Sequence, residues 1–478
     1  MVNAGPGKYL VMDDFNAQPP TDGPFRLSRR GLGALGALGA LAVSAAAAEA
    51  QTPRSRGPSA VTLLATELGV DPASTQDQTA ALQSAIDQAA QRGVALHIPA
   101  GRYIVGRLVL KANSIVSGVA GRTVLTAGLQ GICLAANEVR GVQVRDLTVE
   151  GMMRAPFGGA RGLVTCDGVR DLVLDGLHVF ASATNGIALT GTGGRVDHVR
   201  IDGCKGAALW STDARGLEIA SCLISDCADN GILVWRSAPG EDGTIVRDNR
   251  IQRIANISGG SGQWGNGINV YRAGGVLVTG NHISDCAYTA IRGNAASNIQ
   301  MVGNTALRSG EVALYAEFGF EGALIANNLV DGAGTGIAVT NFNEGGRLAV
   351  VQGNVVRNLK RREHEPVDKR GEGIGIEADA VVTGNVIENA PTAGMLIGWG
   401  RYMRDVVATG NLIRRTKIGI AVTGDTSAGQ CLIAQNMISG ATDGAIRAMN
   451  HAQPITGDLA LQGARPPGRI SVQGNIVG

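Results

Sequence analysis

A repeat that runs through most of the chain is the sequence feature that most limits the possible folds. Units such as VTGNHI, VQGNVV and ATGNLI recur at intervals of about 25 residues. Each unit has a second half of the form G-I-x-V, as in GINVY and GIAVT. Both halves alternate apolar and polar residues like short strands, and Gly or Gly-Asn turns separate them. A single unit cannot bury its apolar side alone, so the units must stack on one another.

The repeat predicts a parallel β-helix, in which stacked strands lie about 4.8 Å apart. Asparagines at equivalent points would then hydrogen-bond along the stack as a ladder. The aligned asparagines are Asn249, Asn281, Asn304, Asn328, Asn354, Asn385, Asn411, Asn436 and Asn475. Weaker early units place Met152, Leu177, Cys204 and Cys222 at the same point. A leucine-rich repeat would need an L-x-x-L-x-L frame, and a propeller would need repeats nearer 40 residues, so both are disfavoured.

Composition agrees with a fold that has many tight turns. The 478 residues include 70 glycines without a three-residue period, which excludes collagen. The net charge of +2 gives no electrostatic footprint for nucleic acid. No apolar run beyond residue 50 is long enough to span a membrane, so we expect no stable anchor in the mature part.

The segment before the repeat predicts one helix followed by the first coils. QDQTAALQSAIDQAAQRG, residues 76–93, places Leu82, Ile86 and Ala89 on one face, with Asp77 or Thr75 as a cap and Gly93 as the stop. The sequence then continues as VALHIPAGRYIV. This run resembles the start of pectate-lyase-type parallel β-helix proteins, in which a helix covers the open end of the solenoid. The resemblance implies an N-terminal cap and first coils over residues 60–118, followed by repeats over residues 119–478.

The N-terminus has the features of an export signal. Ser28-Arg29-Arg30 precedes an uncharged segment, Gly31–Ala48, and Ala48-Glu49-Ala50 supplies a cleavage site. The arginine pair resembles the twin-arginine (Tat) signal, which implies the Tat translocase as a partner and a periplasmic or secreted protein. We therefore expect residues 1–50 to be removed, with Met1 or Met12 as the start. An uncleaved anchor with an accidental arginine pair is the alternative.

Together these motifs resemble a family of twin-arginine-translocated, uncharacterised repeat proteins. Its wider superfamily is pectin-lyase-like and includes pectate lyases, polygalacturonases and mannuronan C5-epimerases. The resemblance implies an all-β fold, a single right-handed parallel β-helix. It also implies a groove over the outer face of one sheet. The D-P-H-D run of the epimerases and the paired aspartates of the polygalacturonases are absent, so the resemblance names no activity.

Outward positions of the G-I-x-V strands supply the candidate site. Aromatic rings stack on sugars, while Arg and Asn bind hydroxyls or carboxylates. The expected substrate-binding residues are Trp235, Asn269, Tyr271, Asn294, Glu377 and Asp379. For a lyase or epimerase acting on an acidic polysaccharide, Arg292 would be the base, assisted by Tyr315 or Glu317. The alternative is that all of these are ordinary surface residues.

Other residues give no metal motif, and the cofactor is unknown. A calcium ion would fit uronate chemistry, but no sequence motif predicts one. The charged insertion Leu359–Gly373 predicts a solvated loop, or a flap whose Glu363, His364, Glu365 and Asp368 bind a metal. The seven cysteines are an odd number, which argues against a full disulfide framework, although Cys204 and Cys222 are expected to be close.

Two further function classes stay open at this point. The repeat alone would suffice for a non-catalytic structural or binding solenoid of the cell envelope. A metal- or cofactor-carrying Tat substrate is the third possibility, and it is disfavoured because no ligand cluster is apparent in the sequence.

Overall fold

Short strands follow one another along the chain in the computed structural model, which describes residues 62–362 and 371–478. The chain divides into two units, Met1–Gly57 and Pro58–Gly478. The predicted signal segment lies outside the described residues, as do Glu363, His364, Glu365 and Asp368 of the charged insertion. None of the helices in the described ranges is long and apolar enough to cross a membrane.

The strands of the second unit form two sheets, and the second sheet divides into two faces, so that most coils contribute one strand to each of three faces. Face A is a sheet of sixteen parallel strands. Its strands are β1 Thr62–Leu64, β2 Ala95–His97, β5 Ile115–Ser117, β8 Gln143–Arg145, β11 Leu172–Asp175, β14 Gly194–Asp197, β17 Leu217–Ala220, β20 Ile245–Arg247, β23 Leu277–Thr279, β26 Ile299–Val302, β29 Glu321–Ala326, β32 Arg347–Gln352, β35 Ala378–Thr383, β37 Arg404–Thr409, β39 Cys431–Ala434 and β43 Ile470–Gln473.

The remaining strands form faces B and C, which are continuous because the long strands β36 (Val386–Ile397) and β38 (Leu412–Thr423) run through both. The other strands of face B are β3 Gly101–Val105, β6 Thr123–Ala127, β9 Thr148–Glu150, β12 His178–Phe180, β15 Arg200–Asp202, β18 Leu223–Cys227, β21 Arg250–Ile254, β24 His282–Cys286, β27 Thr305–Leu307, β30 Leu329–Asp331, β33 Val355–Arg357, β40 Met437–Ala441 and β44 Ile476–Val477.

Face C follows face B in every coil and leads back to face A. Its other strands are β4 Arg107–Leu110, β7 Cys133–Asn137, β10 Gly162–Asp167, β13 Asn185–Thr190, β16 Ala207–Thr212, β19 Asn230–Glu241, β22 Asn266–Gly274, β25 Ile291–Asn294, β28 Val312–Glu317, β31 Thr335–Val339, β34 Glu372–Ile376 and β41 Ile446–Asn450. The short β42 (Gln453–Pro454) pairs with β41 in the antiparallel sense. The predicted all-β solenoid of parallel strands is thus confirmed.

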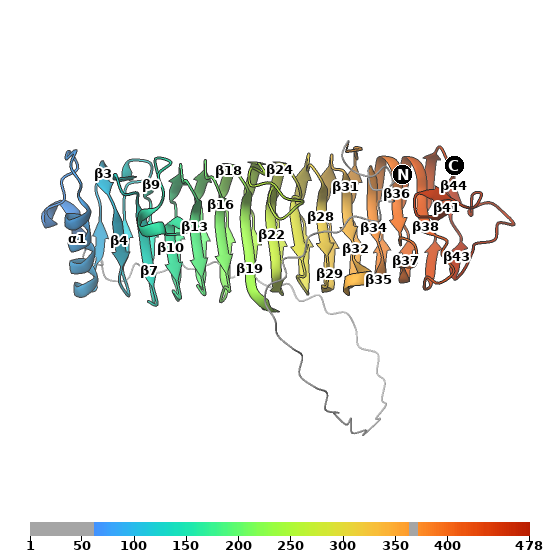
Figure 1. The fold of residues 1–478 in the computed structure, drawn as a ribbon, viewed down its shortest axis with the longest axis horizontal. Coiled ribbons are helices and arrows are strands. Elements are labelled where there is room, and N and C mark those ends of the chain that lie inside the picture. The colour runs from blue at the N-terminus through green and yellow to red at the C-terminus, as the bar shows by residue number, and fades with distance from the viewer. Residues whose placement is uncertain (1–61, 363–370) are drawn as a thin grey trace, which may run out of the picture. The chain divides into compact units, whose positions relative to one another are not determined.

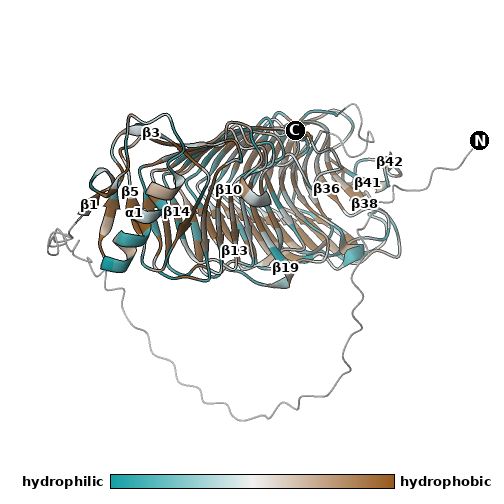
Figure 2. Cartoon of the chain, turned by 60° about the vertical axis from the view of Figure 1, so that its left-hand side comes forward, coloured by the Kyte–Doolittle hydropathy of each residue, from teal (hydrophilic) through white to brown (hydrophobic). Residues whose placement is uncertain are grey.

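Alternation along each strand places apolar side chains inside the solenoid. In β22, Ile268 and Val270 are fully buried, while Tyr271 lies on the outer side. The inward residues of successive coils join into one continuous core. Figure 2 shows the same alternation as brown and teal segments along the strands. Each strand of the solenoid is therefore held in place by the contacts that its inward side chains make with the neighbouring coils.

The asparagine ladder is present as predicted, at the corner between faces A and B. From Asn249 to Asn475, each side-chain Nδ2 donates a hydrogen bond to Oδ1 of the next asparagine at 2.9–3.1 Å. The same oxygen accepts the backbone N–H of the preceding asparagine. The ladder satisfies polar groups that would otherwise be unpaired inside the corner.

The alignment predicted for the early units is correct at two positions and wrong at two. Cys222 lies opposite Asn249, and its N–H donates to Asn249 Oδ1. Leu177 also falls on this line, but Met152 and Cys204 do not. The register gives Leu147 and Val199 in their places. An acidic residue followed by Gly also occurs at the corner between faces B and C, and Met152 and Cys204 follow such pairs there.

The helix α1, Thr79–Arg92, occupies most of the predicted segment and packs against β2, β4 and β5 (Figure 1). Asp77 Oδ1 accepts the N–H of Thr79, and Gly93 ends the helix with a left-handed φ of 64°. Leu82 and Ile86 enter the core, as expected. That α1 shields the end of the solenoid stays a prediction. Three short 3-10 helices are η1 Ala65–Leu68, η2 Phe157–Gly159 and η3 Phe342–Glu344.

Candidate functional site

The outer side of face C carries the predicted site residues in two parallel rows. In one row, Asn269 lies opposite Arg292, and Arg292 lies opposite Tyr315. In the other row, the residues in register are Trp235, Tyr271, Asn294 and Glu317. The G-I-x-V alignment therefore placed these residues on one surface correctly. Equal spacing of the coils brings each side chain to about 4.8 Å from its neighbours in the row.

The loop between β21 and β22, residues 255–265, covers part of this surface. Its Gly262 oxygen accepts a hydrogen bond from Arg292 Nη1 at 2.5 Å, and its Gln263 oxygen accepts one from Asn269 Nδ2 at 3.3 Å. Consequently Asn269 is only 4% exposed and Arg292 only 7%. The alternating pattern did not predict this cover, although the long interval between Asn249 and Asn281 indicates an insertion at this point.

A cluster of aromatic rings lies beside the loop. Trp264 of the loop stacks on Trp235 with ring centroids 6.0 Å apart, and Trp210 of β16 meets Trp235 edge-on at 5.0 Å. Tyr271 closes the cluster at 5.4 Å from Trp235. All four rings are half-buried, so each keeps some surface toward solvent. The predicted set did not include Trp210, because its unit reads AALWS rather than G-I-x-V, although Trp210 lies opposite Leu233 at the x position. It did not include Trp264, because this residue belongs to the loop.

The three predicted catalytic residues contact one another. Arg292 Nε donates to Glu317 Oε1 at 2.5 Å, and its guanidinium lies 5.4 Å from the ring centre of Tyr315. Glu317, only 2% exposed, also accepts a hydrogen bond from Asn294 Nδ2 at 2.9 Å. Glu311 Oε2 lies 3.8 Å from Arg292 Nη1. The residues form one buried polar network rather than an open set of reactive groups.

Electrostatics oppose proton abstraction by this network. Burial tends to lower the pKa of Arg292, but Glu317 and Glu311 outweigh it and raise this pKa. Burial and the Glu317 charge raise the pKa of Tyr315 well above its ordinary value of 10.0. A base needs a lowered pKa and an open position next to the substrate. Arg292 and Tyr315 are therefore poor candidates for the base, and their contacts favour a structural role.

Glu377 and Asp379 do not share one surface. Glu377 follows β34 at the edge of face C, where its Oε2 accepts the N–H of Phe342 at 2.7 Å. Asp379 belongs to β35 of face A, so its placement on the strand of Glu377 was wrong. Its carboxylate accepts hydrogen bonds from Arg404 at 2.8 and 2.5 Å, and this arginine lowers the pKa of Asp379. The chain turns the corner directly after Ile376, which the alternating pattern did not reveal.

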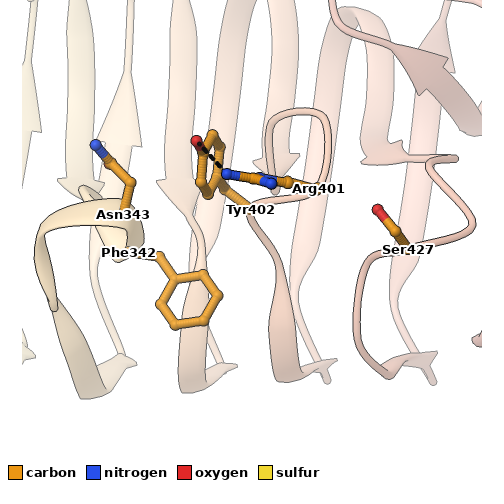
Figure 3. Close-up of a pocket in the computed structure, with 5 residues that line it drawn as sticks. All are labelled: Phe342, Asn343, Arg401, Tyr402 and Ser427. Carbon is orange, nitrogen blue, oxygen red and sulfur yellow. Dashed lines mark hydrogen bonds between the residues drawn. The ribbon is translucent and has the colours of Figure 1, made fainter.

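An open pocket of about 440 Å³ lies at the same corner, between faces C and A (Figure 3). Three corner loops line it, with Phe342 and Asn343 from the loop before β32, Arg401 and Tyr402 from the loop before β37, and Ser427 from the loop before β39. Figure 3 shows Tyr402 and Arg401 between the other side chains. Two aromatic rings, an amide, a hydroxyl and a guanidinium together have the chemistry of a sugar site.

The lining residues are held in place by their neighbours. The ring of Phe342 lies 4.6 Å from the Arg404 guanidinium, and Arg401 lies 5.3 Å from the ring of Tyr402. Ser427 Oγ donates to Asp425 Oδ1 at 2.6 Å. The sequence pattern did not distinguish a sugar contact from an ordinary loop at NFNEGG, residues 341–346, because the partners of this segment lie on coils about 60 and 85 residues further along.

Within residues 62–362 and 371–478, no three His, Cys, Asp or Glu side chains are grouped closely enough to hold a metal ion. In the charged insertion, Glu372 lies in β34 and is buried. The four residues expected to bind a metal, Glu363, His364, Glu365 and Asp368, lie outside the described residues, and the flap stays a prediction.

A family model described as "Right handed beta helix region" matches residues 185–356 and 240–411. These matches cover the Trp235 cluster and the residues that line the pocket, except for Ser427. The fold is a parallel β-helix, and the matching family model describes a right-handed one. The match supports the resemblance to the pectin-lyase-like superfamily, while the narrower twin-arginine family stays a prediction.

Several solved structures are similar to this chain at low identity. The catalytic unit of a GH87 α-1,3-glucanase from Streptomyces thermodiastaticus is 17% identical over 88% of this chain and 69% of its own, with a TM-score of 0.46. PfbA, a surface adhesin of Streptococcus pneumoniae, is 15% identical over 81% and 91%, with a TM-score of 0.41. The A-module of the Azotobacter vinelandii mannuronan C-5 epimerase AlgE6 is 15% identical over 87% and 99%, with a TM-score of 0.34. No curated protein sequence matches the chain.

Proposed function

We propose that this protein is an exported β-helix protein that binds an acidic polysaccharide along the edge between faces C and A. The observation that carries the proposal is the position of its aromatic residues. The chain has only four tryptophans, and all of them lie on face C or in its adjoining loops. Three of them cluster with Tyr271, and the pocket with Phe342 and Tyr402 lies further along the same edge.

The spacing of these rings suits an extended ligand. From Trp235 on β19 to the loop after β36, the edge crosses six steps between coils, which is about 29 Å. A polysaccharide lying along the axis would stack on the Trp235 cluster and on the pocket at the same time. Each ring offers an apolar face to a sugar, and the polar neighbours offer hydrogen bonds.

Charge along this edge favours an acidic ligand. Arg236 of β19 and Arg272 of β22 come directly after Trp235 and Tyr271 in the sequence, and the exposed Arg401 lines the pocket. A guanidinium can bind a uronate carboxylate through two parallel hydrogen bonds. Arg404, in contrast, is already paired with Asp379. We therefore assign the recognition of carboxylates to Arg401 and Arg272.

Binding without catalysis is the function that the geometry favours. The proposed base Arg292 is buried and paired with Glu317, and it cannot reach a ligand unless residues 255–265 move. A lyase or C5-epimerase remains the alternative activity. Incubation with alginate and pectin, followed by detection of unsaturated uronate ends, separates the two, since binding alone produces none.

Export by the Tat translocase to the periplasm or the medium belongs to the same proposal. It rests on Arg29, Arg30 and the A-x-A site at residues 48–50. Expression with both arginines replaced by lysine should leave the full-length chain in the cytoplasm. N-terminal sequencing of the exported form should begin near Gln51.

Binding is tested with a glycan array, followed by titration calorimetry on the best ligand. Trp235→Ala and Tyr402→Ala should each weaken binding about tenfold, which equals roughly 1.4 kcal/mol of lost stacking. Phe180→Ala is the matched control, because Phe180 is a half-buried outer aromatic on face B. Equal effects of all three substitutions, or no uronan among the ligands, would contradict the proposal.

A further inference from the structure

Cys204 and Cys227 occupy equivalent points of neighbouring coils. Their strands β15 and β18 pair in parallel, with Asp202 opposite Ser225, and each cysteine comes two residues later. The residue before each cysteine has a left-handed backbone, with φ of 63° at Gly203 and 57° at Asp226. The two coils thus turn the corner in the same way, and each thiol donates to the backbone oxygen two residues before it, Cys204 Sγ to Asp202 O at 3.9 Å and Cys227 Sγ to Ser225 O at 3.4 Å.

Nearby cysteines are placed less favourably. Cys222, the partner expected from the sequence, lies at the corner between faces A and B, where its Sγ contacts the oxygen of Ala220 at 3.2 Å. Cys286 is in register with Cys227 only through Ile254, so it is two coils away, about 9.6 Å. Neither can reach Cys204 without a shift of the backbone.

A surface hollow gives small molecules access to the pair. Its volume is about 370 Å³, and both cysteines line it together with Lys205, Asp226 and Arg253. The thiols themselves are 2% and 1% exposed, so they lie at its floor. The hollow is on the corner between faces B and C, where the chain of each coil leaves face B.

We propose that Cys204 and Cys227 are an oxidation site that becomes an inter-coil disulfide in the presence of a disulfide oxidant. This inference is independent of the polysaccharide site. Neighbouring strands lie about 4.8 Å apart, within the Cα separations that disulfides span. A thiolate of the pair attacks one sulfur of the oxidant RSSR and releases RS⁻, which takes up a proton. The second thiolate then attacks the mixed disulfide and releases the other RSH, so two electrons and two protons pass to the oxidant.

Exchange at this site should be slow. The hydrogen bond from Cys227 and burial raise the pKa of the Cys204 thiol, and the thiolate is the reacting form. The oxidation should therefore be followed over a day rather than over minutes. The product would close a loop that links consecutive coils and restrict their separation in the unfolded chain.

The experiment uses the purified full chain with oxidised glutathione as the oxidant. Free thiols are then counted in denaturant, and peptide mapping locates the link. We expect a loss of two thiols, from seven to five, and a bond between the tryptic peptides that contain Cys204 and Cys227. Because Cys222 and Cys227 fall in one tryptic peptide, the assignment is repeated on Cys222→Ser.

The variants separate this pair from the alternatives. Cys222→Ser should still lose two thiols, whereas Cys204→Ser and Cys227→Ser should lose none. The oxidised wild type should unfold at a temperature a few degrees higher than Cys204→Ser treated in the same way. A link from Cys204 to Cys222, stable glutathione adducts in place of a link, or seven thiols after a day would overturn the proposal.

Discussion

Side chains on face C are more deeply buried than their outward positions suggest. Arg292 and Glu317 occupy outward positions, yet both are buried, and the loop over residues 255–265 contacts Arg292 directly. A buried charge is tolerated only when it is paired and hydrogen-bonded. The network around Glu317 meets this requirement through Arg292 and Asn294. The residues that looked most reactive in the sequence thus stabilise the surface next to the aromatic cluster.

We predict that Arg292→Ala lowers the free energy of unfolding by about 3–5 kcal/mol, because it leaves Glu317 buried without its counter-ion. Urea titration at neutral pH measures this change. Replacing both residues, as Arg292→Met with Glu317→Gln, should recover much of the loss. Arg236→Ala is the control, since Arg236 is half-exposed, and it should change stability by less than about 0.5 kcal/mol. An Arg292→Ala variant as stable as this control would contradict the structural role.

Individual strands of this fold are too short to be stable alone, so the contacts between coils decide their stability. The asparagine ladder shows how a repeated residue serves this purpose. Asn354 donates to Ile325 O and Asn385 Oδ1, and its own Oδ1 accepts from Asn328 N and Nδ2. One side chain therefore ties together three consecutive coils at one corner.

We predict that Asn354→Ala destabilises the protein by about 3 kcal/mol, because donors of Asn328 and the oxygen of Ile325 lose buried partners. The end of the ladder offers a control in Asn475, which is partly exposed and has no further asparagine to donate to. Asn475→Ala should cost less than about 1 kcal/mol. Thermal unfolding gives the stabilities, and hydrogen exchange should show faster opening of β30, β33 and β36 in Asn354→Ala only. Equal losses at both positions would argue against the ladder.

At the scale of the whole solenoid, the strands of each described coil pair with the strands of the coil before it and of the coil after it. Such a fold tolerates the gain or loss of complete coils, because the register of the remaining strands is unchanged. The gain or loss of only part of a coil is not tolerated, because the shift in register would place outward residues in the core. The intervals between the ladder asparagines can vary for the same reason, because insertions such as residues 255–265 lie in corner loops.

We predict that deletion of residues 177–198, one complete coil, leaves a folded protein. The deletion joins Gly176 to Val199, so β9 can pair with β15 and β11 with β17 as their present neighbours do. Circular dichroism and a cooperative thermal transition measure the outcome. Deletion of residues 177–187 alone is the control, and it should fail to fold because it removes β12 and interrupts β13. Loss of structure in both variants would contradict the independence of the coils.

The sequence by itself determined the solenoid. Repetition with alternating apolar residues leaves stacking as the way to bury them, and it fixed the ladder from Asn249 to Asn475 and the common surface of Trp235, Tyr271 and Arg292. The sequence pattern also placed Cys204 at the wrong corner, because an acidic residue followed by Gly occurs at two different corners of the solenoid. Only the tertiary structure decided which outward residues stay exposed. Covering loops and corner pockets join residues from different coils, and no local pattern records that Trp264 packs on Trp235 or that Phe342 meets Tyr402 across a pocket.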